Sequence, residues 1–125
     1  RSICKGKLWC VFGCGGDRDL LKRKVMGKIA TDFADQIIIT NDNPRTEEPK
    51  AIIRDILQDL TPKELAKTLV EEDRANAIAY AIQQALKDDV VLIAGKGHED
   101  FQIIGNKKIP FSDIQTVKKI VGESL

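Results

Sequence analysis

QIIITNDNPRTEE, residues 36–48, is the stretch around which this chain is organised. The apolar run at 37–39 is typical of a buried strand, and Asn43-Pro44 then favours an extended turn before a helix can begin. Arg45 presents a planar fork of donors suited to a carboxylate or phosphate, while Asp42 and Asn43 present acceptors suited to an ammonium group. The loop therefore fits a zwitterionic ligand, although an ordinary surface loop held by a salt bridge has the same composition.

A strand, a polar loop and a helix also follow one another earlier in the chain. An apolar strand at 7–12 precedes the loop GCGGDRD, which leads into an amphipathic helix at about 20–34. The 3.6-residue period places the following apolar side chains on one face of that helix: Val25, Met26, Ile29, Ala30 and Phe33. The continuous apolar run at 90–94 predicts a strand at the middle of a parallel sheet. It ends in a third polar loop, GKGHED.

The remaining segments complete an alternating order of strands and helices. Apolar positions between 52 and 60 predict a helix, 67–71 is a weak candidate for a short strand, and Asp73 can cap a helix that ends at about 86. A tight turn at 105–106 predicts a hairpin that adds an antiparallel edge strand, and Ser112 with Gln115 forms a capping box for a last helix. The order predicts an α/β fold: a Rossmann-like open, mostly parallel sheet with helices on both faces.

Composition narrows the class of protein. With 125 residues, 42% of them apolar, the chain is expected to form a single domain over 1–125, and its start without methionine suggests a fragment of a longer protein. Twenty basic and nineteen acidic residues are spread evenly, which argues against a nucleic-acid partner. No apolar run is long enough for a membrane span or a secretory signal, so no membrane partner and a cytoplasmic location are expected. Cys4, Cys10 and Cys14 lack the spacing of a zinc site, so no metal site is predicted.

The three polar loops are expected to meet. Ligands of open α/β sheets bind at the carboxyl ends of the strands, and each of these loops directly follows a strand. Glu99 could hold an ammonium group there or be an ordinary exposed carboxylate, and Arg18 could face the ligand or pair with its acidic neighbours. The lone His98 is more typical of a structural hydrogen bond than of a base. Basic residues between 22 and 28 are expected to form a solvated face, unless one reaches a phosphate.

Two nucleotide-binding patterns fail in these loops. The glycine-rich loop after the first strand has Arg18 where a dinucleotide fingerprint needs its third glycine, so tight turning is the expected role of its glycines. The loop Gly95-Lys96-Gly97 lacks the spacing and the hydroxyl residue of a phosphate-binding P-loop. The chain therefore offers no standard nucleotide motif of its own.

Together, GCGGDRD, DNPRTE and AGKGHEDFQ resemble the C-terminal domain of the Mur ligases, and more narrowly the MurE-type branch. That resemblance implies an ATP-dependent carbon–nitrogen ligase of peptidoglycan synthesis that adds meso-diaminopimelate to UDP-MurNAc-L-Ala-D-Glu. The residues that it assigns to the amino acid are Arg18, Asp42, Asn43, Pro44, Arg45, Gly95 and Glu99, with Arg45 on the distal carboxylate. ATP and Mg²⁺ would bind mainly outside this chain, which would hold no catalytic residue and be inactive alone.

Three other functions remain open from the sequence. A related ligase domain could use L-lysine, although Arg45 would then lack a carboxylate to bind. The chain could also be a free-standing nucleotide- or phosphate-binding module, or a purely structural interaction domain. The last would bind no amino acid.

Overall fold

A four-stranded parallel sheet forms the centre of the protein, with strand order β3-β2-β1-β4. The structure is a computed structural model, and it describes residues 6–14, 21–44, 46–94, 101–104, 107–110 and 112–121. Its strands are β1 (Leu8–Phe12), β2 (Gln36–Ile39), β3 (Thr68–Val70) and β4 (Val90–Ile93). β1 pairs in parallel with β2 and β4, opposing Cys10 to Ile37 and to Leu92. The predicted open parallel sheet is confirmed.

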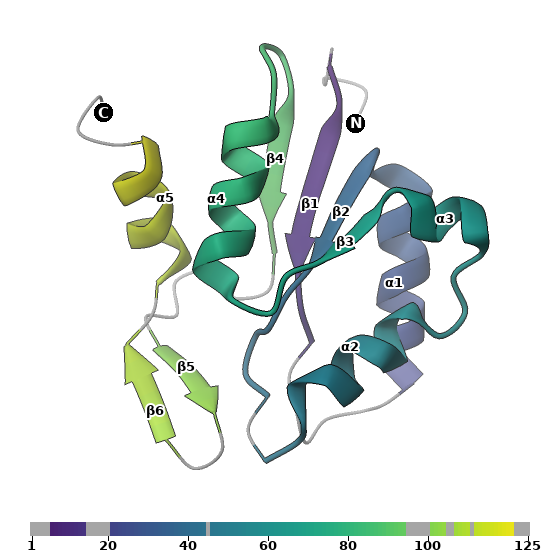
Figure 1. Ribbon diagram of the computed structural model, residues 1–125, viewed down its shortest axis with the longest axis vertical. Coiled ribbons are helices and arrows are strands. Elements are labelled where there is room, and N and C mark those ends of the chain that lie inside the picture. The colour runs from purple at the N-terminus through teal and green to yellow at the C-terminus, as the bar shows by residue number, and fades with distance from the viewer. Residues whose placement is uncertain are drawn as a thin grey trace.

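Helices cover both faces of this sheet (Figure 1). One face carries α1 (Leu21–Phe33) and α2 (Pro49–Leu57), while α4 (Arg74–Gln84) packs on the other and contacts α5 (Asp113–Val121). A short α3 (Pro62–Ala66) connects α2 to β3, and its Thr61–Glu64 capping box was not foreseen from the sequence. The two-sided cover predicted from the alternating pattern is therefore present.

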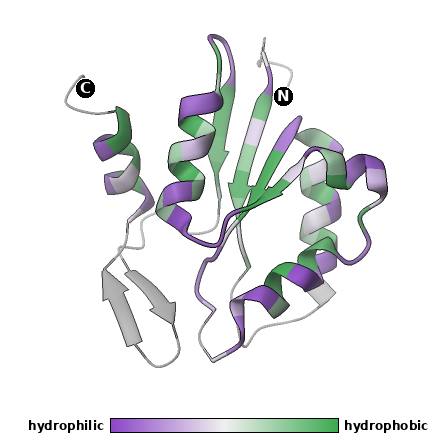
Figure 2. Ribbon diagram, in the orientation of Figure 1, coloured by the Kyte–Doolittle hydropathy of each residue, from purple (hydrophilic) through white to green (hydrophobic). Residues whose placement is uncertain are grey.

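Alternate side chains of β1 divide between the two cores. Leu8, Cys10 and Phe12 pack with α1 and α2, whereas Trp9 and Val11 pack with α4. All five residues are buried, and apolar residues predominate in the strands in Figure 2. Burial on both faces is expected of a strand inside a parallel sheet. Cys10 thus lies in the apolar strand that the sequence predicts at 7–12, and it is buried there.

The prediction that β4 lies at the middle of the sheet is wrong. It lies at the edge of the sheet that the described strands form, and Val90 and Leu92 are about two-fifths exposed. An apolar run indicates burial of some kind but does not say which strands flank it. The hairpin strands β5 (Phe101–Ile104) and β6 (Lys107–Pro110) form as expected, yet they make a separate two-stranded sheet and add no strand to the main one.

The predicted apolar face of α1 is also incorrect in part. Val25 and Ile29 are more than half exposed and Met26 is 39% exposed, whereas Ala30 is buried. The helix is rotated because it packs closely on α2: a Cβ at Gly27 would lie 2.5 Å from the main-chain oxygen of Ile56. Met26 and Ile29 therefore turn towards an apolar groove between α1 and the β4 edge. Its lining also includes Phe33, Cys10, Phe12 and Leu92.

A polar cluster fixes the connection between α1 and α3. Glu64 accepts hydrogen bonds from Lys28 Nζ (2.7 Å), the Thr61 amide (2.9 Å) and the Thr31 hydroxyl (3.0 Å). The hydrogen bond from Lys28 contributes most to lowering the pKa of Glu64, which falls from 4.5 to about 2. A lowered pKa means that the folded state favours the charged carboxylate. Glu64 thus stabilises the fold only while it is ionised.

We predict that Glu64→Gln removes part of the acid sensitivity of folding. The wild-type stabilisation is complete above the unfolded pKa near 4.5 and is lost as the pH falls towards about 2. Denaturant unfolding at several pH values should therefore show the largest difference between wild type and Glu64→Gln above that range, and a vanishing difference near its lower end. Lys28→Met should shrink the difference without abolishing it, because the Thr61 amide remains. A pH-independent difference would contradict this account.

Candidate functional site

The carboxyl ends of β1, β2 and β4 lie side by side, and each continues into one of the polar loops (Figure 1). The Thr40 amide donates to the main-chain oxygen of Phe12 at 2.9 Å, and the Ala94 amide donates to that of Val11, also at 2.9 Å. These bonds extend the parallel ladder to Thr40, the first residue of the second loop, and to Ala94, the residue before the third loop. The expectation that the three loops start at one edge of the sheet is confirmed.

Gly13 lets the first two loops approach each other closely. A Cβ at this position would lie 2.2 Å from the main-chain oxygen of Thr40 and 3.0 Å from the amide nitrogen of Asp42. Both contacts are with main-chain atoms, which cannot move aside as a flexible side chain could. Gly13 is therefore required by the approach of the two loops, a reason other than the tight turning expected from the sequence.

Three of the seven predicted ligand residues lie within the described part of the chain. Asp42 is partly exposed, Asn43 is 4% exposed and Pro44 is fully buried. The other four lie outside the described residues: Arg18, Arg45, Gly95 and Glu99. His98 lies outside them as well. Asp42 thus remains accessible at the edge of the sheet, while its two neighbours anchor the loop in the protein.

A buried arginine on α1 holds the far end of this loop. Arg23 is 1% exposed, and its Nη2 and Nη1 donate to the two Glu47 carboxylate oxygens at 2.7 and 3.0 Å. Nη1 also donates to Asp55 on α2 at 2.8 Å. These carboxylates, with the hydrogen bond to Glu47 the largest cause, raise the pKa of Arg23 further above its ordinary value. The prediction of a solvated basic face is therefore wrong for Arg23, which joins α1, the loop and α2.

The burial of Arg23 was not predicted because Lys22 and Lys24 flank it, and the basic run as a whole indicates a solvated face. Its position four residues before Gly27, on the helix face that also carries Ala30, places it on the stripe that packs inward. Small residues at helical spacing mark a close helix contact, and a long side chain on the same stripe can bury its stem there. That stripe was the available signal.

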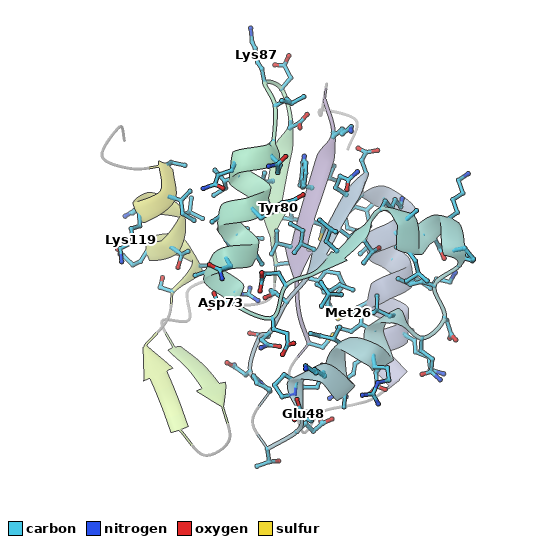
Figure 3. All side chains as sticks on the ribbon, in the orientation of Figure 1. Met26, Glu48, Asp73, Tyr80, Lys87 and Lys119 are labelled. Atoms are coloured by element: carbon cyan, nitrogen blue, oxygen red, sulfur yellow. The ribbon has the colours of Figure 1, made fainter. Side chains whose placement is uncertain are left out.

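A second buried arginine contacts the residues that follow β2 and β4. Arg74, in the first turn of α4, forms a two-bond ion pair with Asp113 on α5, with distances of 2.7 and 2.8 Å. It also donates to the main-chain oxygens of Asn41 and Ala94, each at 3.1 Å. Nothing in the sequence distinguished this arginine from an ordinary helix residue. Figure 3 places Asp73, next to it, towards the same end of the molecule as Glu48 and away from Lys87.

Burial disfavours the thiolate form of Cys14, the cysteine at this edge. Burial raises the pKa of the Cys14 thiol to about 11, an effect opposed by Arg23 and reinforced by Asp42. The thiol is therefore protonated at neutral pH, and its sulfur lies 3.8 Å from that of Met26. The described part of the edge suits ligand orientation better than covalent catalysis.

The described residues contain neither a metal-binding cluster nor a membrane-spanning helix. Among those residues, no group of three or more His, Cys, Asp or Glu side chains is arranged to hold a metal ion. Of the helices in the described segments, none combines the length and the apolar character that a membrane span requires. The side chains of the described residues therefore do not form a site that fits Mg²⁺.

Comparison with known proteins gives concordant matches. The family described as "Mur ligase, glutamate ligase domain" matches residues 1–97. A UDP-N-acetylmuramoyl-L-alanyl-D-glutamate–2,6-diaminopimelate ligase from Prochlorococcus marinus is 53% identical over 121 residues, which are 97% of this chain and 24% of that protein. A solved structure of a ligase of the same name has a TM-score of 0.89 and 41% identity, covering 94% of this chain and 24% of its own. The chain thus spans about a quarter of the length of these relatives.

We predict that Arg23→Met loosens the loop between β2 and α2. Losing the guanidinium should cost about 1.5 kcal/mol of folding stability, at the low end for charged hydrogen bonds because Glu47 and Asp55 are partly exposed to water. Amides at residues 42–48 should then exchange hydrogen faster, measured by mass spectrometry. Arg54→Met, on the exposed face of α2, is the matched control and should leave this exchange unchanged. Equal exchange in both variants would argue against the anchoring role.

Proposed function

Since this chain belongs to the Mur ligase family, in its glutamate ligase domain, we propose that it is the amino-acid-recognition domain of a diaminopimelate-adding ligase. The full-length enzyme would join meso-diaminopimelate to UDP-MurNAc-L-Ala-D-Glu with hydrolysis of ATP, in the cytoplasm. The observation that carries the proposal is the Asp42-Asn43-Pro44-Arg45 loop, which starts at the carboxyl end of β2 beside the starts of two other polar loops. The names of the relatives support the same acceptor.

The proposed acceptor is a zwitterion with two amino-acid ends, and the loops offer groups for both. The planar guanidinium of Arg45 suits the distal carboxylate, and the carboxylates of Asp42 and Glu99 suit an ammonium group. Arg18 and Gly95 complete the proposed set. Asn43 and Pro44, buried beneath the loop, would hold its shape so that these groups keep a fixed spacing.

Discrimination against L-lysine would follow from a missing partner. Lysine lacks the second carboxylate, so its binding would leave Arg45 desolvated and unpaired. Leaving a charged partner buried and unpaired costs about 2–5 kcal/mol. A penalty of that size corresponds to at least about a thirtyfold preference for meso-diaminopimelate, and the preference arises without any added contact to the side-chain methylenes.

The proposed contribution of this domain to catalysis is orientation. ATP and Mg²⁺ belong to other parts of the full-length enzyme, where ATP would activate the glutamate carboxylate of the nucleotide substrate as an acyl phosphate. This chain would then hold the attacking amine of the amino acid in line with that carbonyl carbon. Fixing the amine in one geometry replaces a bimolecular encounter with an effectively unimolecular step, so the domain can raise the rate without a catalytic residue of its own.

The direct test is phosphate release by the full-length protein. With ATP, Mg²⁺ and UDP-MurNAc-L-Ala-D-Glu present, meso-diaminopimelate should stimulate release and L-lysine should not, because only the former supplies the distal carboxylate. Formation of the tripeptide product should be followed by mass spectrometry in the same samples. Equal turnover with lysine would keep a ligase but remove the proposed acceptor, and turnover with neither would favour a binding module.

A second prediction concerns Arg45 alone. In the full-length enzyme, Arg45→Ala should lower kcat/KM for meso-diaminopimelate by about 30-fold or more, since a charged pair with a carboxylate is lost. The KM for ATP and the thermal unfolding midpoint should stay close to wild type. Arg54→Ala, a matched loss of an exposed arginine, should leave all three unchanged. Wild-type turnover in Arg45→Ala would refute the assigned role.

A further inference from the structure

Arg74 is the most completely enclosed charged side chain among the described ion pairs. Its side chain has 0% exposure and that of Asp113 has 8%. Nε and Nη2 donate to the two oxygens of one carboxylate, the two-bond geometry that holds a guanidinium in a fixed plane. Since Asp113 is the first residue of α5, the pair fixes the start of that helix against the start of α4.

The guanidinium also donates hydrogen bonds to two main-chain oxygens, each on the residue just before a proposed ligand residue. Nη1 donates to the main-chain oxygen of Asn41 and Nη2 to that of Ala94, each at 3.1 Å. Asn41 directly precedes Asp42, and Ala94 directly precedes Gly95. One rigid planar group therefore bonds to both segments that lead into the proposed ligand residues, on strands that are separated in the sheet by β1.

We propose that Arg74, clamped by Asp113, is a positioning residue that sets the spacing between the 42–45 loop and the loop that follows Ala94. The proposal rests on the proposed function, because those loops are the ones that would hold the amino acid. Arg74 itself would not contact the ligand. Its effect would pass through two main-chain oxygens, so it would govern how well the amino acid is oriented.

The neighbouring contacts show which loop depends more on Arg74. The start of the loop that follows β2 is held by further hydrogen bonds. The Thr40 hydroxyl and the Asn41 amide both donate to the main-chain oxygen of Glu72, at 3.2 and 3.4 Å. Ala94 has its amide bond to Val11 and its bond from Arg74. Loss of Arg74 would therefore change the position of the third loop relative to the second, and leave the second largely in place.

Stability alone is a weak reason for such a pair. Desolvation of two charges offsets most of their attraction, and well-packed apolar residues of similar volume often replace a buried ion pair with no loss of stability. An apolar pair cannot, however, donate to the oxygens of Asn41 and Ala94. Replacing both partners at once thus separates the stabilising effect of Arg74 from its effect on the loops.

The test uses the double variant Arg74→Met/Asp113→Leu in the full-length enzyme. We expect a thermal unfolding midpoint near that of wild type, a kcat/KM for meso-diaminopimelate lowered about tenfold to a hundredfold, and an unchanged KM for ATP. The amide of Ala94, which donates to the main-chain oxygen of Val11, should also exchange hydrogen faster. A folded double variant with wild-type kcat/KM and exchange would overturn the proposal, because Arg74 would then serve stability only.

Lys67→Met is the matched control. Lys67 Nζ donates to the main-chain oxygens of Thr31 and Ala34, at 2.6 and 2.8 Å, so the variant also loses two bonds from a cation to carbonyls. These bonds lie at the end of α1, and kcat/KM for meso-diaminopimelate should stay at the wild-type value. An equal fall in both variants would also overturn the proposal, since general destabilisation would explain it.

A second variant covers the case in which the double variant does not fold. Arg74→Lys keeps a cation for Asp113 but lacks the planar fork, so it should show the same fall in kcat/KM, and wild-type kinetics would overturn the proposal. Failure of the proposed function is distinguishable, because wild type itself would then show no turnover with meso-diaminopimelate. In that case the hydrogen exchange at Ala94 still decides whether Arg74 positions the segment that follows β4.

Discussion

Parallel pairing of β1 with both β2 and β4 is the constraint on which the rest of the structure depends. β1 is buried along its whole length, and its register aligns the last residues of its two neighbours with its own. Parallel strands end at the same edge of a sheet, so three loops that are far apart in sequence begin close together. Thr40 and Ala94, at the ends of β2 and β4, donate main-chain hydrogen bonds to Phe12 and Val11 at the end of β1. No loop needs to reach across the sheet to join the proposed site.

Two buried arginines stabilise that edge from opposite faces of the sheet. Arg23, on the α1 face, binds Glu47 at the far end of the second loop, and Arg74, on the α4 face, binds the starts of the second and third loops. Both have carboxylate partners, as a buried charge must to offset the cost of leaving water. Main-chain segments are thus positioned by side chains that need not touch a ligand. Such an arrangement leaves Asp42 partly exposed while Asn43 and Pro44 beside it are buried.

The apolar groove between α1 and β4 shows which contacts determine the rotation of α1 about its own axis. The apolar period of α1 fits a face with Val25, Met26 and Ile29, but close packing at Gly27 and the ion pairs of Arg23 turn that face outward. Three charge-assisted hydrogen bonds of Arg23 and a tight main-chain contact at Gly27 outweigh the partial burial of three apolar side chains. β4 is exposed on the same side because it lies at the edge of the four-stranded sheet.

The sequence by itself determined the order and type of the main elements, the parallel sheet and the edge of the sheet from which the polar loops begin. These depend on local periodicity, on turn residues such as Asn43-Pro44, and on the general rule for strand ends. Only the tertiary structure decided that β4 lies at the edge, that the hairpin is a separate sheet, and that Arg23 and Arg74 are buried. The burial of the two arginines depends on contacts between residues 24 and 39 positions apart, Arg23 with Glu47 and Arg74 with Asp113, which no local pattern encodes.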